Sequence, residues 1–195
     1  CYALIHRAQR GNMKLKFNLI ILIFLSTSIL AETYTSKYVG EEDREIKSLS
    51  LDDIAELKKG GGWGLAKVAE LNGIPGPVHI LEMEKQIHLT KAQKEKIQKI
   101  HEKMKVEAIS LGEQLIEVEK ELNNHFANKT IDQALLEKLL YKIENIRSKL
   151  RVTHLSTHLQ TPNILSSDQI NLYNQLRGYS SDPCKNIPEG HNAEM

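Results

Sequence analysis

The sequence lacks an excess of charge of either sign. Its 195 residues include 26 Lys and Arg against 25 Asp and Glu, which gives a formal net charge of +1. A nucleic-acid-binding protein needs a basic excess to contact phosphates. The charge balance therefore argues against nucleic acid as a partner.

The usual signatures of an enzyme are also missing. The triple glycine Gly60–Gly62 is not followed by Gly-Lys-Ser or Gly-Lys-Thr, so it does not have the pattern of a phosphate-binding loop. A helix stop and hinge is the interpretation that it favours. No nucleophile–base pair and no acid–base pair of carboxylates stands out. The sequence therefore predicts a protein that is not an enzyme.

A hydrophobic run long enough to span a membrane is absent. The apolar run from Phe17 to Leu25 is too short for this purpose. It follows the basic stretch Met13–Lys16 and precedes the small-residue run Ser26–Ala31, which is the order of a secretory signal peptide. We expect residues 13–31 to be this signal peptide, with cleavage near Ala31. Residues 1–12 are predicted to be an upstream extension, and the alternative is a longer basic leader.

Cysteine is scarce as well, with two residues in the whole sequence. Cys1 lies in the predicted upstream extension, so the mature chain would contain only Cys184 and no internal disulfide. No internal disulfide is therefore expected, although the predicted signal peptide would direct the chain to an oxidising compartment, where disulfides form. Cys184 lies in a polar tail, where pairing between chains is possible but an exposed thiol without a special role is favoured.

Helical periodicity is what the sequence has in abundance. Two long segments carry apolar residues at steps of three and four, with charges elsewhere, and no strand alternation is present. The first segment begins with a predicted capping box of Thr90 and Gln93, and the second, which runs to about Leu159, with one of Thr130 and Gln133. We predict an all-α fold, a long antiparallel helical hairpin with shorter flanking helices.

The rest of the chain is organised around this hairpin. Short helices are predicted after a cap at Ser50, over 63–71 and over 78–87, and a final helix follows a capping box at Ser166. The apolar stripes of a thin hairpin are not fully covered by the hairpin itself, so we expect a homodimer. The predicted parts of the mature chain are an N-terminal segment with short helices (32–76), the helical hairpin domain (77–178) and a polar tail (179–195).

The stretch THLSTHL (153–159) places two histidines where the apolar stripe calls for Leu or Ile. His154 and His158 are four residues apart and so project from one helix face. A hairpin turn centred near Asn128 puts His101 opposite residue 155. A bend near Thr90 folds the preceding short helix back, so that His79 lies opposite His101. The residues that this geometry brings together are His79, Met83, His101, His154 and His158.

Imidazole and thioether groups suit a borderline or soft cation such as zinc, nickel, cobalt or copper. The small share of carboxylates argues against calcium or magnesium. The alternative is that these histidines are partly buried residues that only form hydrogen bonds. The sequence pattern leaves both interpretations open.

The pentapeptides LTKAQ (89–93) and LSSDQ (165–169) bracket the hairpin. They resemble the paired LTxxQ motifs of the Spy/CpxP family of bacterial periplasmic proteins, and the resemblance covers about residues 77–178. It implies a periplasmic location. The family includes ATP-independent chaperones, envelope-stress regulators, zinc-resistance-associated proteins and periplasmic heavy-metal sensors.

In the sensor branch, the resemblance implies ligands in three places: a pair before the first long helix, a carboxylate on that helix, and a pair at the end of the second. His79 and Met83 occupy the first place and His101, next to Glu102, the second. His154 and His158 occupy the third.

Two functions follow as expectations. The first is a periplasmic protein that binds a transition metal through the histidine cluster and acts in the response to heavy metals or envelope stress. The second is an ATP-independent chaperone that holds unfolded periplasmic proteins on a helical cradle. A membrane sensor protein is a further possible partner.

Overall fold

The computed structural model describes residues 34–179. The chain forms two units, Cys1–Lys37 and Tyr38–Met195, and every described helix belongs to the second. The predicted signal peptide, the upstream extension and residues 180–195 of the tail lie outside the described residues. None of the described helices is long and apolar enough to cross a membrane.

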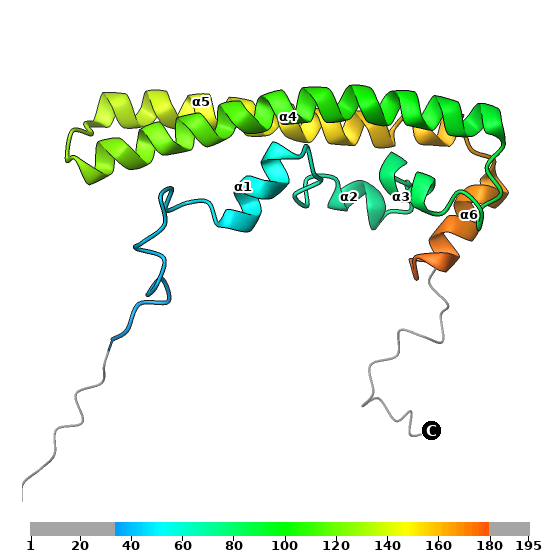
Figure 1. The fold of residues 1–195 in the computed structure, drawn as a ribbon, viewed down its shortest axis with the longest axis horizontal. Coiled ribbons are helices and arrows are strands. Elements are labelled where there is room, and N and C mark those ends of the chain that lie inside the picture. The colour runs from blue at the N-terminus through cyan, green and yellow to red at the C-terminus, as the bar shows by residue number, and fades with distance from the viewer. Residues whose placement is uncertain (1–33, 180–195) are drawn as a thin grey trace, which may run out of the picture. The chain divides into compact units, whose positions relative to one another are not determined.

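The prediction of an all-α hairpin is confirmed, because the described residues form helices and no strand. The long helices α4 (Lys91–Ala127) and α5 (Gln133–His158) run antiparallel and pack along their length, with the remaining helices along one side and at one end (Figure 1). The other elements are α1 (Leu51–Lys58), α2 (Lys67–Glu70), α3 (Pro77–Glu82), the 3-10 turn Thr161–Asn163 and α6 (Ser167–Leu176).

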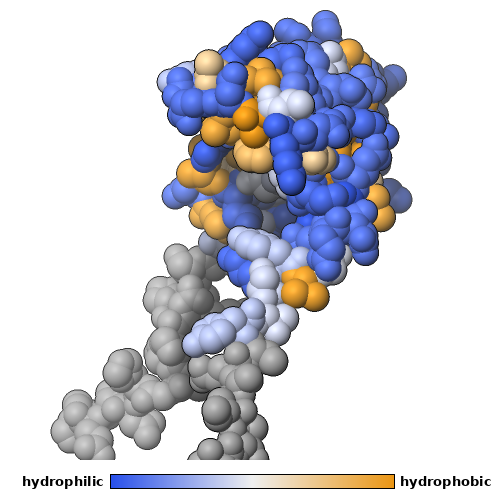
Figure 2. Space-filling view, turned by 90° about the vertical axis from the view of Figure 1, so that its left-hand side faces the viewer, coloured by the Kyte–Doolittle hydropathy of each residue, from blue (hydrophilic) through white to orange (hydrophobic). Residues whose placement is uncertain are grey.

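The register of the hairpin is close to the predicted one. Ile100 and Met104 of α4 line the same shallow cleft as Thr153 and Thr157 of α5. The predicted apolar stripes form the seam, since Met104, Leu115, Leu139 and Leu150, among others, are buried. Viewed toward the end with the α4–α5 turn, the surface is mainly hydrophilic, with scattered hydrophobic residues (Figure 2).

The N-terminal segment covers much of the apolar seam. Ile46, Leu49 and Leu57 are each 2% exposed and belong to the same buried cluster as the hairpin residues. The end of α1 comes so close to α4 at Gly112 that a Cβ there would lie 2.5 Å from the backbone oxygen of Leu57. Glycine at position 112 therefore allows this segment to dock on the hairpin.

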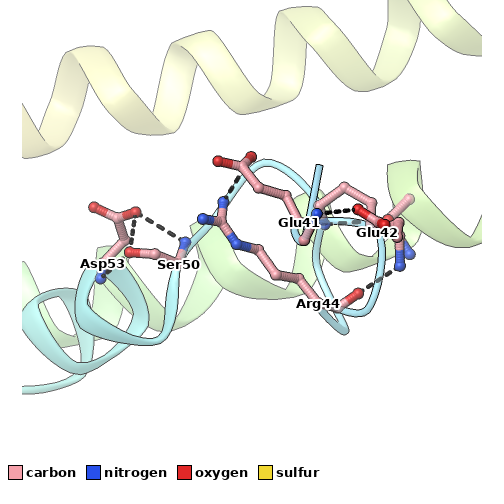
Figure 3. A network of polar contacts seen from close by, with 8 residues as sticks. Glu41, Glu42, Arg44, Ser50 and Asp53 are labelled. Carbon is pink, nitrogen blue, oxygen red and sulfur yellow. Dashed lines mark hydrogen bonds and ion pairs between the residues drawn. The ribbon is translucent and has the colours of Figure 1, made fainter. Parts of the chain in front are cut away.

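The start of α1 is fixed by its own side chains. The Ser50 hydroxyl accepts a hydrogen bond from the Asp53 amide at 3.1 Å, and Asp53 in turn accepts one from the Ser50 amide at 2.9 Å. Figure 3 shows Asp53 turned back toward Ser50, with Arg44 reaching Glu41 in the preceding loop. This reciprocal capping box satisfies two backbone donors at the helix start, and it confirms the cap predicted at Ser50.

The two motif glutamines meet at the end of the hairpin remote from the α4–α5 turn. The Gln93 side-chain amide donates to the Gln169 side-chain oxygen at 2.9 Å, and the Gln169 amide donates back at 3.0 Å. Each glutamine also completes the capping box of its own helix, with Thr90 for α4 and Ser166 for α6. The duplicated motif therefore joins the starts of two helices that are far apart in sequence.

Three local predictions were wrong. The helix expected over 78–87 ends at Glu82, and the one over 63–71 is reduced to α2, because Trp63 has a φ of 42° that helical backbone does not allow. The cap of α5 is Asp132 and not Thr130. The Asp132 carboxylate accepts from the Leu135 amide at 2.8 Å, whereas the Thr130 hydroxyl contacts the His125 ring at 2.8 Å.

Candidate metal centre

Three of the five predicted ligands, His79, His154 and His158, line one pocket. Its walls are the loop Gly60–Gly64, helix α2, the start of α3 and the inner face of α5 near its end. The bend between α3 and α4 and the antiparallel hairpin are what bring these distant residues together. Sequence reasoning predicted that these three residues converge, and their role as ligands stays a prediction.

His158 has a defined tautomer. Its Nδ1 lies 2.9 Å from the backbone oxygen of Ile74, and because a carbonyl oxygen can only accept, Nδ1 carries the proton and donates. The neutral ring then has its lone pair on Nε2. That nitrogen lies against Gly76, where a Cβ would be only 2.8 Å away.

His154 is the more deeply buried of the pair, at 4% exposed, one turn earlier on α5. Its Nε2 is buried and has no hydrogen-bond partner among the described residues. Burial, with a smaller contribution from the neighbouring His158, lowers the pKa of His154 below its usual value of 6.5. The ring is therefore neutral at pH 7, which is the form that binds metals.

His79 lies in the first turn of α3 and is partly exposed. Its Nδ1 lies 2.8 Å from a carboxylate oxygen of Glu82, which accepts the Nδ1 proton. As in His158, this leaves the lone pair on Nε2. Metal-binding histidines commonly donate their other N–H to a carbonyl or carboxylate in this way.

His101 and Met83 are not among the residues that line the pocket. Met83 packs against the buried cluster that includes Ile80 and Ile97. His101 is partly buried on α4, and burial together with the charge of Lys105 lowers its pKa. A ligand role for these two residues stays a prediction, without a place in this pocket.

The pocket contains two groups that sequence reasoning missed. Met104 lines it, although its position in the apolar stripe indicated only a core residue. Glu70 lines it from α2, and its carboxylate accepts hydrogen bonds from the Gly76 amide at 3.2 Å and from the Tyr173 hydroxyl at 3.0 Å. No spacing rule connects Glu70 to the histidines, so the sequence held no signal for it.

Between residues 34 and 179, no three His, Cys, Asp or Glu side chains are already arranged to hold a metal ion. The pocket instead contains imidazoles with available Nε2 atoms, a carboxylate and a thioether along its walls. Rotation of the side chains would be needed to direct them at one ion. Imidazole, carboxylate and thioether groups are the side chains that proteins use as ligands for transition metals.

The family model of the LTXXQ motif family protein matches residues 78–177. The chain belongs to this family. The match includes both motif glutamines, Gln93 and Gln169, and it places the chain among Spy/CpxP-type proteins, which are typically periplasmic. Neither a curated protein nor a solved structure matches the chain.

Proposed function

We propose that this Spy/CpxP-type protein works in the periplasm and binds a transition metal ion through His79, His154 and His158, in the response to heavy metals or envelope stress. One observation carries the proposal. The three histidines line one pocket, two of them donate Nδ1–H to fixed acceptors, and the Nε2 of His154 is buried without a partner.

The energetic argument concerns that unpartnered nitrogen. A buried polar atom without a hydrogen bond costs about 1–3 kcal/mol. Coordination of a cation by the lone pair of His154 would offset this cost. The Nδ1–H groups of His79 and His158 already donate to oxygen acceptors, which leaves Nε2 as the ligand atom of each ring.

The ligand set favours zinc, nickel, cobalt or copper, because neutral imidazole suits these borderline ions. Met104 in the pocket wall would add a soft donor for copper. Binding would weaken as the pH falls through the histidine range of about 6.5, since a proton competes for each Nε2 lone pair.

Calorimetric titration of the chelator-treated full chain with each of the four metals tests the proposal. His154→Leu removes one ligand and fills the site. His158→Asn removes Nε2 but keeps a side-chain amide that can donate to the Ile74 oxygen. Both variants are expected to weaken binding at least about tenfold. The control His88→Asn changes an exposed histidine outside the pocket and should bind like the wild type. Absence of binding by the wild type, or unchanged binding in both variants, would contradict the proposal.

Client holding is the second candidate, favoured by a different surface. Val106 on α4 is 71% exposed and lines a shallow cleft, in which apolar side chains lie beside charges of both signs from Lys99, Lys103, Glu102 and Glu107. A chaperone of this type would suppress aggregation of an unfolded protein without ATP. It would do so equally well in the His154→Leu variant, which separates this activity from metal binding.

A further inference from the structure

The segment from Gly60 to Gly76 lies outside the residues that the family model matches, yet it forms a wall of the histidine pocket. We propose that this segment supplies a metal ligand of its own: the Glu70 carboxylate binds the ion together with His79, His154 and His158. The inference rests on the proposed metal site and gives it a fourth donor of a different chemical class.

The first argument is the geometry at Gly76. A Cβ built on Gly76 would lie 2.8 Å from Nε2 of His158 and 2.9 Å from Oε1 of Glu70. Both atoms therefore lie next to one point, which is vacant because glycine has no side chain. Gly76 has φ −91° and ψ 151°, a backbone conformation open to any residue, so its φ and ψ do not require glycine. The space that it leaves is what the site needs.

The second argument is how the carboxylate is held. Glu70 accepts from the Gly76 amide and from the hydroxyl of Tyr173, which is fully buried, and Arg177 lies 4.0 Å away. A carboxylate has about four acceptor sites, so these contacts leave capacity for a metal. Ligating carboxylates are commonly positioned by hydrogen bonds of this kind.

The donor set selects the class of metal. Three imidazole nitrogens and one carboxylate oxygen are a common set for zinc, with bonds of about 2.0–2.2 Å to each. A hard carboxylate oxygen disfavours copper(I), which prefers sulfur. We therefore expect zinc, or cobalt(II) as its spectroscopic substitute. The ion would tie α2 to the end of α5.

The alternative role of Glu70 is structural, as a link between α2, the Gly76 loop and α6. The variant Glu70→Gln separates the two roles, because its amide oxygen still accepts from the Gly76 amide and the Tyr173 hydroxyl while the charge is lost. The matched control is Glu56→Gln. Glu56 lines the same pocket but is paired with Lys59.

The experiment is titration of the chelator-treated full chain and both variants with zinc, and with cobalt(II) followed by visible absorption. Glu70→Gln should weaken zinc binding at least about tenfold and change the cobalt spectrum, while Glu56→Gln should leave both unchanged. Gly76→Ala, which places a methyl group between the two ligand atoms, should also weaken binding.

The outcomes distinguish the two proposals. If His154→Leu and His158→Asn lose zinc but Glu70→Gln and Gly76→Ala bind like the wild type, the role of Glu70 is overturned and the histidine site stands. If the wild type binds neither zinc nor cobalt, the role of Glu70 falls, and if it binds none of the four metals, both proposals fall. If Glu70→Gln melts far below the wild type without metal, the structural role accounts for Glu70, and unchanged binding by the folded Gly76→Ala chain would then overturn the inference.

Discussion

The two histidines at the end of α5, His154 and His158, are four residues apart and lie on the same helix face, but their contacts differ. The sequence placed both on one helix face, and the structure confirms that both line the same pocket. The partner of His158 is the backbone oxygen of Ile74, which is 84 residues away along the chain. No local pattern predicts such a contact, so the tautomer could be assigned only from the structure.

The burial of His154 leads to a prediction about pH and stability. Its pKa is lowered in the folded state, so the unfolded chain takes up a proton first as the pH falls. The stability that comes from keeping this ring neutral is fully present above about pH 6.5 and is lost as the pH falls toward the folded pKa.

We therefore expect the metal-free protein to lose stability between pH 7.5 and 5.5, and His154→Leu to lose less. At pH 7.5 the variant should be more stable by roughly 1–3 kcal/mol, because an unpartnered buried nitrogen is removed. Urea unfolding in the presence of a chelator measures both quantities. A variant with the same pH slope as the wild type and lower stability would show that His154 makes a stabilising hydrogen bond instead.

At the scale of the elements, capping residues predicted most helix starts. Ser50 caps α1 as expected, and Thr90 and Ser166 form the expected capping boxes. The start of α5 was predicted two residues too early. Thr130 was expected to be the N-cap, but the N-cap is Asp132. The lengths of the short helices α2 and α3 were overestimated, since tertiary contacts and turns outweigh weak helical periodicity in segments of this length.

The hydrogen bonds between the side-chain amides of Gln93 and Gln169 give the two copies of the family motif a structural role, which can be tested by mutation. Replacing Gln93 by Leu removes its hydrogen bonds to Gln169 and to the Ile164 oxygen, and it also removes the acceptor of the Thr90 amide at the start of α4. We expect a loss of roughly 1–3 kcal/mol in the free energy of unfolding.

The matched control is Gln114→Leu on the same helix, where the exposed side chain contacts only Ser110. Its effect should stay within about 0.5 kcal/mol. Chemical denaturation of both variants measures the difference. Equal losses would mean that the glutamine pair contributes no more to stability than an ordinary surface contact.

At the scale of the whole molecule, the N-terminal segment changes the argument for assembly. The homodimer was predicted because a hairpin alone leaves its apolar stripes exposed. In the structure Ile46, Leu49 and Leu57 cover part of that surface. The homodimer stays a prediction, and its interface would have to use other residues.

The exposed apolar side chains of the hairpin are the candidates for that interface. Val106 is 71% exposed on α4 and Val152 is 59% exposed on α5, and both lie beside Lys103 and Glu107. We expect light scattering on the full chain to give a dimer and the variant Val106→Glu to shift it toward monomer. A wild-type monomer at high concentration would contradict the dimer, and an unaffected variant would exclude this interface.

The fold was largely predictable from the sequence, and the site only in part. Helical periodicity and the turn near Asn128 were sufficient for the hairpin and its register. The bend expected near Thr90 then placed His79 near the α5 pair. Glu70 could not be predicted because its contacts with the Gly76 amide and the Tyr173 hydroxyl follow from the tertiary fold and not from a spacing in the sequence. His101 and Met83 are not among the residues that line the pocket. The register between two helices predicts which residues lie opposite each other, but it does not predict the direction of each side chain.

The central claim is that imidazoles of this pocket bind a metal ion, and X-ray absorption of the zinc-loaded full chain tests it most directly. The account predicts a first shell of nitrogen and oxygen atoms at about 2.0–2.2 Å from the zinc ion. It also predicts outer-shell scattering from about three imidazole rings, and a smaller number of rings in the His154→Leu variant. A spectrum without imidazole scattering, or one that is the same in wild type and variant, would contradict it.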